Sequence, residues 1–141
     1  MGLDMFLAAK RFYWSSEEPP VVADVPEGYK VQTVTTEAAY WRKSNQIHQW
    51  FVMNVQDGED ECRPFSVEHD QLRTLVDLCE QVIAAPETAE DILPTESGCF
   101  FGSTEYDEHY FADLASTVEM LEKALDAFDA DKWSFEYCAS W

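Results

Sequence analysis

The sequence predicts an α+β fold, a single compact domain in which a mixed or antiparallel sheet is packed by about three helices. At 141 residues the chain has the size of one ordinary domain. Hydrophobic residues make up 46% and aromatic residues 14%, enough to build a core despite the many charges. Runs rich in aromatic and β-branched residues lie near both ends, and stretches with helical periodicity lie between them. We therefore expect residues 1–141 to form one acidic domain.

The expected strands are short runs of aromatic and branched residues bounded by turn-forming residues. The first two are "LDMFLAAKRFYW" (3–14) and "YKVQTVTT" (29–36), separated by a Pro-rich loop at 17–28. "CRPFSV" (62–67) is a candidate short strand, and "SGCFFGS" (97–103) is either a short strand or a buried turn. "WSFEYCASW" (133–141) is expected as the last strand.

The first two expected helices each follow a residue that can cap them. Thr36 is placed to cap a helix from about residue 37 to residue 54, which a "DGEDE" loop at 57–61 ends. Ser66 is placed to cap a second helix, with Glu68 and Asp70 in its first turn, where the helix dipole favours anions. The core positions of the second helix recur at intervals of three and four: Leu72, Leu75, Val76, Cys79, Val82 and Ile83.

The third expected helix has the clearest periodicity in the chain. Thr104 and Asp107 match a capping box in front of it. Its apolar residues fall alternately three and four positions apart, as one buried face of a helix requires: Phe111, Leu114, Val118, Leu121, Leu125 and Phe128.

Metal and cofactor sites are not expected from the motifs. The four cysteines (Cys62, Cys79, Cys99 and Cys138) show no CxxC pair or metal-type spacing, so buried, reduced thiols are the favoured interpretation. His109 lacks a second histidine or carboxylate at ligand spacing, and neither "DGEDE" nor "DAFDAD" fits a calcium-binding loop.

The sequence also indicates a cytoplasmic protein. "MGLDMFLAAKRF" lacks the basic start and long apolar run of a signal peptide. No run of apolar residues is long enough to predict a membrane-spanning helix.

"YWRKSNQIHQWFV" (40–52) is the densest group of functional side chains in the sequence. If this stretch is helical, it has two faces. The expected core face holds Tyr40, Ile47, Trp50, Phe51 and Asn54, and the other face holds Trp41, Arg42, Asn45, His48, Gln49 and Val52. One alternative is then a small enzyme or ligand site, in which His48 is a general base, Arg42 binds an anion and Asn45 lies beside them. Such a site needs a third group, such as a nucleophile, a metal or a carboxylate held against the histidine, and no catalytic motif supplies one. We therefore favour structural hydrogen bonds for these residues and expect no catalytic residue.

The negative charge is distributed unevenly along the chain. Net charge is −19; residues 1–56 carry six acidic against five basic residues, and residues 57–141 carry 22 against four. Such a field repels nucleic acid and anionic membranes and attracts basic partners, so neither direct nucleic-acid binding nor membrane binding is expected. Solubility and adaptation to high salt are alternative explanations of the charge.

Three stretches resemble a family of small phage- and prophage-encoded proteins that have no settled activity. The matching motifs are the "MGLDMFL" start, the "WRK-N-IH-WF" pattern at 41–51 and the "FFGST-YD" pattern at 100–107, followed by Phe111. They cover roughly a third of the chain and carry over no catalytic residues. The resemblance implies a phage setting and a compact intracellular accessory protein.

In a phage setting, the acidic charge favours an inhibitor of host defence, of the anti-CRISPR or anti-restriction type. Carboxylates at phosphate-like spacing can occupy the Lys/Arg groove of a nucleic-acid-binding host protein or nuclease complex. The expected partner-binding residues are Asp57, Glu59, Asp60 and Glu61 of the loop, with Glu108, Glu119, Glu122, Asp126 and Asp129 along the third helix. A phage structural or assembly protein is a further alternative. A homodimer and an apolar interface formed by some of the five tryptophans are two more alternatives.

Overall fold

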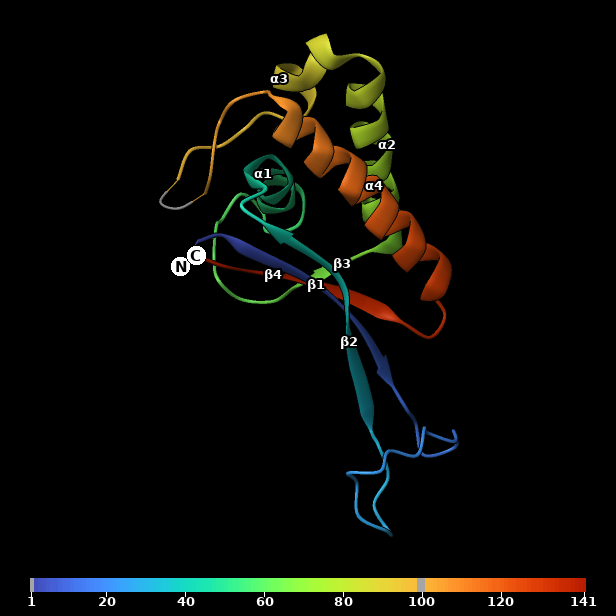
Figure 1. Ribbon diagram of the computed structural model, residues 1–141. Helices are drawn as coiled ribbons and strands as arrows, with labels where there is room; N and C mark the ends of the chain where they lie inside the picture. The colour runs from blue at the N-terminus through green and yellow to red at the C-terminus, as the bar shows by residue number, and fades with distance from the viewer. Residues whose placement is uncertain (1, 99–100) are drawn as a thin grey trace.

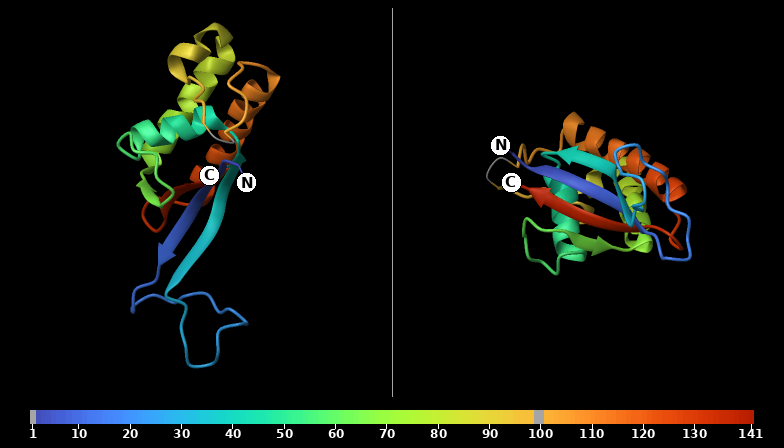
Figure 2. Two further views of the ribbon diagram at one scale, coloured as in Figure 1. Left: turned by 90° about the vertical axis from the view of Figure 1, so that its left-hand side faces the viewer. Right: turned by 90° about the horizontal axis from the view of Figure 1, so that it is seen from below.

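The computed structural model describes residues 2–98 and 101–141 of the chain. Within them, four strands form one antiparallel sheet in the order β2-β1-β4-β3, and the helices cover one of its faces (Figures 1 and 2). The elements are β1 (Asp4–Phe12), β2 (Thr33–Arg42), α1 (Asn45–Asn54), β3 (Phe65–Val67), α2 (His69–Ala84), the 3₁₀ turn η1 (Pro86–Thr88), α3 (Ala89–Ile92), α4 (Glu108–Ala127) and β4 (Ser134–Ser140). The predicted α+β class is confirmed, and the sheet is antiparallel throughout.

The two central strands, β1 and β4, hold the sheet side of the core. Their side chains alternate between the helix-covered face and the open face, as the pleat of a strand requires. Met5, Leu7 and Ala9 of β1 are buried beside Phe135 and Tyr137 of β4. The Phe51 ring of α1 stacks on Tyr137 with ring centroids 3.8 Å apart, which joins the helical layer to the middle of the sheet.

The predicted helix from residue 37 to residue 54 is wrong in its first half. Residues 33–42 form strand β2, which pairs with β1 along its whole length, from Asp4↔Arg42 to Phe12↔Thr33. Hydrogen bonding to β1 therefore outweighs the helix-like spacing of residues 37–42. Lys43 turns the chain with a positive φ of 54°, and α1 begins only at Asn45, after Ser44.

Helix α1 is buried around most of its circumference, so the predicted division into a core face and a polar face is also wrong. Ile47, Trp50 and Phe51 are buried as predicted, and so are Asn45, Gln46, His48 and Val52. Tyr40 and Asn54, predicted for the core face, are exposed. A helix enclosed in this way has to satisfy its polar side chains within the protein.

Helix α2 begins later than predicted. Ser66 lies in β3, opposite Glu136 of β4, and the N-cap is Glu68, which forms a capping box with Gln71. The predicted core positions are confirmed from Leu72 to Val82, but Ile83 is 41% exposed.

Helix α4 is the predicted third helix, with its buried stripe rotated slightly. Asp107 is the N-cap and accepts hydrogen bonds from the backbone N–H groups of His109 and Tyr110, so Thr104 takes no part in a capping box. The fully buried stripe is Tyr110, Leu114, Thr117, Leu121 and Ala124. Phe111, Val118, Leu125 and Phe128 are half-buried along its edge.

The remaining sequence predictions concern the cysteines, the 97–103 segment and the membrane. Cys79 is buried as predicted, Cys138 is half-buried, and Cys62 is exposed, which corrects its prediction. Cys99 and Phe100 lie outside the described residues, and the rest of the 97–103 segment contains no strand. Among the described helices, none is both long and apolar enough to span a bilayer.

The connection between β1 and β2, residues 13–32, projects from the domain as a long arm (Figures 1 and 2). A hydrogen bond of 2.8 Å from the Tyr13 N–H to the Gln32 carbonyl extends the strand ladder into its base. Beyond that bond the arm leaves the sheet, away from the helical layer.

Candidate functional site

Charge is separated between the two layers of the fold. The four strands together carry three acidic and three basic residues. Helices α2, α3 and α4 with the η1 turn carry eleven acidic residues against only Arg73 and Lys123. We call this set the acidic layer: Asp70, Asp77, Glu80, Glu87, Glu90, Asp91, Glu108, Asp113, Glu119, Glu122 and Asp126. Of the net charge of −19, the acidic layer carries −9 and the segments that connect the elements carry −10, while the strands are balanced.

Carboxylates meet where α2 packs beside α4. Burial raises the pKa of Glu80, and a hydrogen bond to Glu122 and the charges of Glu122 and Asp77 raise it further. Acidic side chains from two different helices therefore lie close together at this position. Like charges held in contact destabilise the ionised state, and a cationic partner would relieve this repulsion.

The predicted binding residues of α4 fall into two groups. Glu119, Glu122 and Asp126 are exposed on the second half of the helix. Asp129 follows in the next loop, where it accepts a hydrogen bond from the Lys132 N–H. Glu108 is also exposed but lies at the start of the helix, about 16 Å from Glu119 at the usual rise per residue.

Sequence reasoning missed the contribution of α2 to this surface. Asp70, Asp77 and Glu80 recur on the polar side of α2, opposite its core positions. The helical periodicity that predicts the core positions of α2 also indicates which of its residues face solvent, and these three are among them. Their position beside α4 depends on the tertiary packing of the two helices.

The carboxylates of the predicted acidic loop at 57–61 differ in their contacts. Asp57 and Glu59 are exposed, while Glu61 forms an ion pair with Arg63. Asp60 has a side chain that is 34% exposed, and its Oδ1 accepts hydrogen bonds from His48 Nε2 at 2.9 Å and from Trp141 Nε1 at 3.1 Å.

His48 lies at the centre of a closed polar network. Asp60 supplies the carboxylate that the enzyme alternative required, and the Tyr137 hydroxyl lies 2.6 Å from Nδ1 on the other side of the ring. Since a carboxylate only accepts, the network assigns the proton to Nε2, and Nδ1 accepts from Tyr137. Burial lowers the pKa of His48, against the opposing effect of Asp60, and burial raises the pKa of Tyr137 well above its ordinary value. The imidazole is therefore neutral, and the tyrosine keeps its proton.

This network leaves His48 without a free atom for a ligand. The residue is 1% exposed, and both ring nitrogens are engaged. The edge of its ring also faces Phe101, with centroids 5.5 Å apart. Its geometry is that of a buried structural histidine.

Asn45 holds the segment that leads to α4. Its side-chain amide donates to the carbonyls of Phe101 (3.1 Å) and Ser103 (2.9 Å), and its Oδ1 accepts from the Glu96 N–H at 3.0 Å. The side chain thereby satisfies three backbone groups that no strand or helix pairs. Asn45 and His48 thus lie against one loop.

Arg42 does not join the other two residues of the alternative ligand site. It lies on β2, 3.5 Å from the Asp4 carboxylate, and points to the open face of the sheet with its side chain 55% exposed. The prediction that Arg42 lies beside Asn45 and His48 assumed one helix from residue 37 to residue 54, whereas Arg42 belongs to β2.

The larger hollows lie away from these residues. Two, of about 260 and 420 Å³, are on the arm, and one of about 330 Å³ lies between α1 and the α3 region. A fourth, of about 270 Å³, is lined by residues of β3, the start of α2 and the start of β4. The described residues contain no group of three or more histidine, cysteine or acidic side chains placed to hold a metal ion.

Comparison of the chain with protein-family models, curated proteins and solved structures found no match. The features that bear on function are therefore those of the chain itself: an acidic layer, a closed histidine network and a projecting arm.

Proposed function

We propose that this protein is a phage-encoded, non-enzymatic inhibitor that acts in the host cytoplasm. Its acidic layer would occupy the basic groove of a nucleic-acid-handling defence complex, of the anti-CRISPR or anti-restriction type. The observation that carries the proposal is the separation of charge, with eleven acidic residues on the helical layer and a balanced sheet. The phage setting depends on the sequence motifs at 1–7, 41–51 and 100–107.

The carboxylates of α4 have a spacing suited to a phosphate-binding groove. From Glu119 to Asp126 the helix rises about 10 Å, so neighbouring carboxylates are on the order of 5 Å apart along it. Phosphates along one nucleic-acid strand are spaced similarly, and each one neutralised by Lys or Arg contributes to affinity. A row of carboxylates can therefore meet the same basic side chains.

Helix α2 adds carboxylates to the same surface. Glu80 lies next to Glu122 of α4, and Asp77 lies about one turn before Glu80 on α2. The carboxylates of the two helices therefore form one dense negative patch on a rigid support, which can attract the Lys and Arg side chains of a basic groove.

Catalysis at His48 is not proposed, because both of its nitrogens are bonded within the protein. The enzyme alternative from the sequence also loses Arg42, which lies on the open face of the sheet.

The test is affinity capture from host lysate at low and moderate salt, followed by competition with DNA or RNA for the captured protein. The critical variant carries Glu119→Lys, Glu122→Lys and Asp126→Lys. Binding through the acidic layer should fall at least about tenfold, through lost attraction and added repulsion, and wild-type binding should weaken as salt rises.

A matched control carries Glu18→Lys, Asp24→Lys and Glu27→Lys on the arm. All six residues are exposed, so both triple variants should fold, and both change the net charge equally. If both triple variants lose binding equally, the effect is one of total charge. If the α4 variant binds with wild-type affinity, the proposed surface is wrong.

A further inference from the structure

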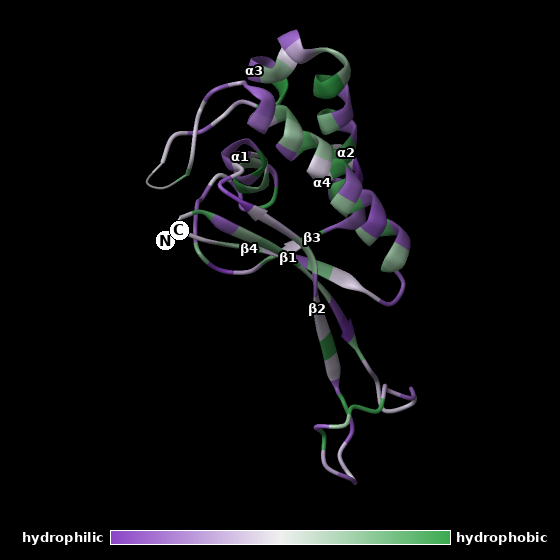
Figure 3. Ribbon diagram, in the orientation of Figure 1, coloured by the Kyte–Doolittle hydropathy of each residue, from purple (hydrophilic) through white to green (hydrophobic). Residues whose placement is uncertain are grey.

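The arm exposes apolar side chains that the domain does not cover. Val21 is 100% exposed, Tyr29 75%, Trp14 68% and Val22 42%, and Phe12 at its base is 42% exposed. Figure 3 shows hydrophobic stretches in the loop at the tip, far from the core. Isolated exposed apolar residues are common, but this grouping on one projecting element is typical of an interaction surface.

The surface area of the chain supports the same view. A compact monomer of 16.2 kDa is expected to expose about 7,500 Å². This chain exposes 8559 Å². The excess, about 1,100 Å², is comparable with the roughly 800 Å² that each partner buries in a standard interface. The arm is the part of the fold that projects into solvent and enlarges this area (Figure 2).

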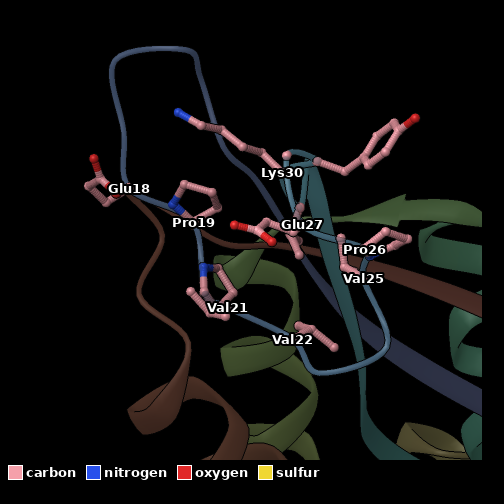
Figure 4. Close-up of a pocket in the computed structure, with 12 residues that line it drawn as sticks. Glu18, Pro19, Val21, Val22, Val25, Pro26, Glu27 and Lys30 are labelled. Atoms are coloured by element: carbon pink, nitrogen blue, oxygen red, sulfur yellow. The ribbon is translucent and has the colours of Figure 1, made fainter.

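The arm also contains hollows of its own. One, of about 260 Å³, is lined by residues 18–22 and 25–31 at the tip, including Pro19, Val22, Val25 and Pro26 (Figure 4). A second, of about 420 Å³, is lined by Phe12, Trp14 and other residues near the base. One element thus carries both projecting apolar groups and recesses of side-chain size.

We propose that the arm is a homodimer interface, at which two copies of this chain pack arm against arm around a two-fold axis. A two-fold contact uses the same patch on both subunits, so that patch must contain both projections and recesses. Residues 12–32 satisfy this requirement.

The distribution of charge favours the arm over the acidic layer as the contact between two copies. Residues 12–32, the proposed contact, carry four acidic residues and one basic residue. The elements of the acidic layer carry eleven acidic residues against two basic ones. Two copies therefore repel each other less when they meet through the arms than through the acidic layers, which then point outward.

Sedimentation velocity of the full-length protein over a range of concentrations, at low and high salt, tests this proposal. A reversible shift from 16.2 kDa toward twice that mass is expected. Salt should strengthen the dimer, because it screens repulsion between acidic subunits while apolar contact remains. The sign is opposite to that expected for partner binding by the acidic layer, so this proposal and the proposed function can fail separately.

The interface variant is Val21→Asp with Tyr29→Asp, which should leave the monomer folded because both positions are exposed. Its dimer dissociation constant should rise at least tenfold. The control is Met53→Asp with Ile83→Asp, which changes two exposed apolar residues of the helical layer and gives the same net charge. The control should dimerise as the wild type does.

Three results would overturn the proposal. They are a wild-type protein that remains monomeric at every concentration, an arm variant that dimerises with unchanged affinity, and a dimer that dissociates as salt rises. If the wild type is monomeric and captures a host protein that the arm variant does not capture, the arm is the contact for that host protein instead.

Discussion

The Tyr137 hydroxyl donates a 2.6 Å hydrogen bond to Nδ1 of His48, joining residues 89 positions apart in the sequence. Asp60 accepts from the other ring nitrogen, and Trp141 donates to the same carboxylate oxygen. The network thereby connects α1, the loop after it and the last strand through side chains alone. Buried polar groups with all partners present stabilise one specific arrangement of such elements.

Acid should weaken this network. Burial is the main cause that lowers the pKa of His48, so the folded state prefers the neutral ring more strongly than the unfolded state does. The stabilising contribution is fully present above the unfolded pKa, about 6.5, and is lost as pH falls through the lower folded pKa. The free energy of unfolding, measured by urea titration from neutral to mildly acidic pH, should therefore decrease more in the wild type than in His48→Gln. Parallel pH profiles for the two proteins would contradict a neutral, buried His48.

Measurements of partner binding distinguish a structural role of His48 from a functional one. We expect His48→Gln to lower stability modestly and to leave partner binding nearly intact. A folded His48→Gln protein that lost its biological effect would favour the enzyme or ligand-site alternative.

Leu121 should be among the most sensitive positions of α4. It is fully buried, whereas Leu125 lies half-buried at the edge of the same stripe. Leu121→Ala should lower the free energy of unfolding by about 2–5 kcal/mol, through lost burial and the cavity left behind. Leu125→Ala should lower the free energy of unfolding clearly less. Equal losses in urea titrations would show that Leu125 is as well packed as Leu121, as the sequence pattern predicts.

That stripe shows which parts of the fold can be predicted from sequence. The periodicity of α4 is local, and it located the helix with only a small rotation of the buried face. Residues 37–42 could not be assigned from local spacing, because their strand conformation depends on pairing with β1, about 30 residues earlier. The strand assignment of β1 and β4 succeeded because the runs that contain them, 3–14 and 133–141, carry four aromatic residues each.

The candidate site shows the same limit. The exposure of Glu119, Glu122 and Asp126 follows from their place opposite the core stripe of α4. Glu80 could be added only once α2 was seen to pack beside α4. Asp60 is exposed, as a surface carboxylate should be, but it is also held by His48 and Trp141. No local sequence pattern indicates contacts with residues that far away in the chain.

Gly102 should be required for the contact between the loop before α4 and the start of α1. Its φ is +91°, and a Cβ there would lie 3.1 Å from the Lys43 carbonyl oxygen and 3.0 Å from the Lys43 Cβ. Gly102→Ala should therefore destabilise the protein by about 1–3 kcal/mol, from backbone strain and this close approach. Gly58→Ala is the control, because Gly58 has a similar φ of +83° and open space around it. Thermal or urea unfolding should show the larger loss for Gly102→Ala, and identical losses would leave strain as the sole cause.

Glu80 should show opposite effects on stability and on binding. Its pKa is raised by burial and by Glu122 and Asp77, so its negative charge is unfavourable in the free protein. Glu80→Gln should therefore raise the melting temperature, and the gain should shrink at high salt, where the repulsion is screened. If the acidic layer binds a basic groove, the same change should slow association with the captured partner, because charge at an interface acts mainly through the association rate.

The control for this prediction is Glu87→Gln, which removes the same charge from an exposed position on η1. It should leave the melting temperature nearly unchanged and slow association less than Glu80→Gln does. A faster or unchanged association rate for Glu80→Gln, beside a raised melting temperature, would show that the Glu80–Glu122 contact lies outside the binding surface. An unchanged melting temperature would show that the two carboxylates do not repel each other in the free protein. The proposed function requires that Glu80 and Glu122 repel each other in the free protein and that binding relieves this repulsion. The melting temperature and the association rate therefore both have to be measured on the same variant.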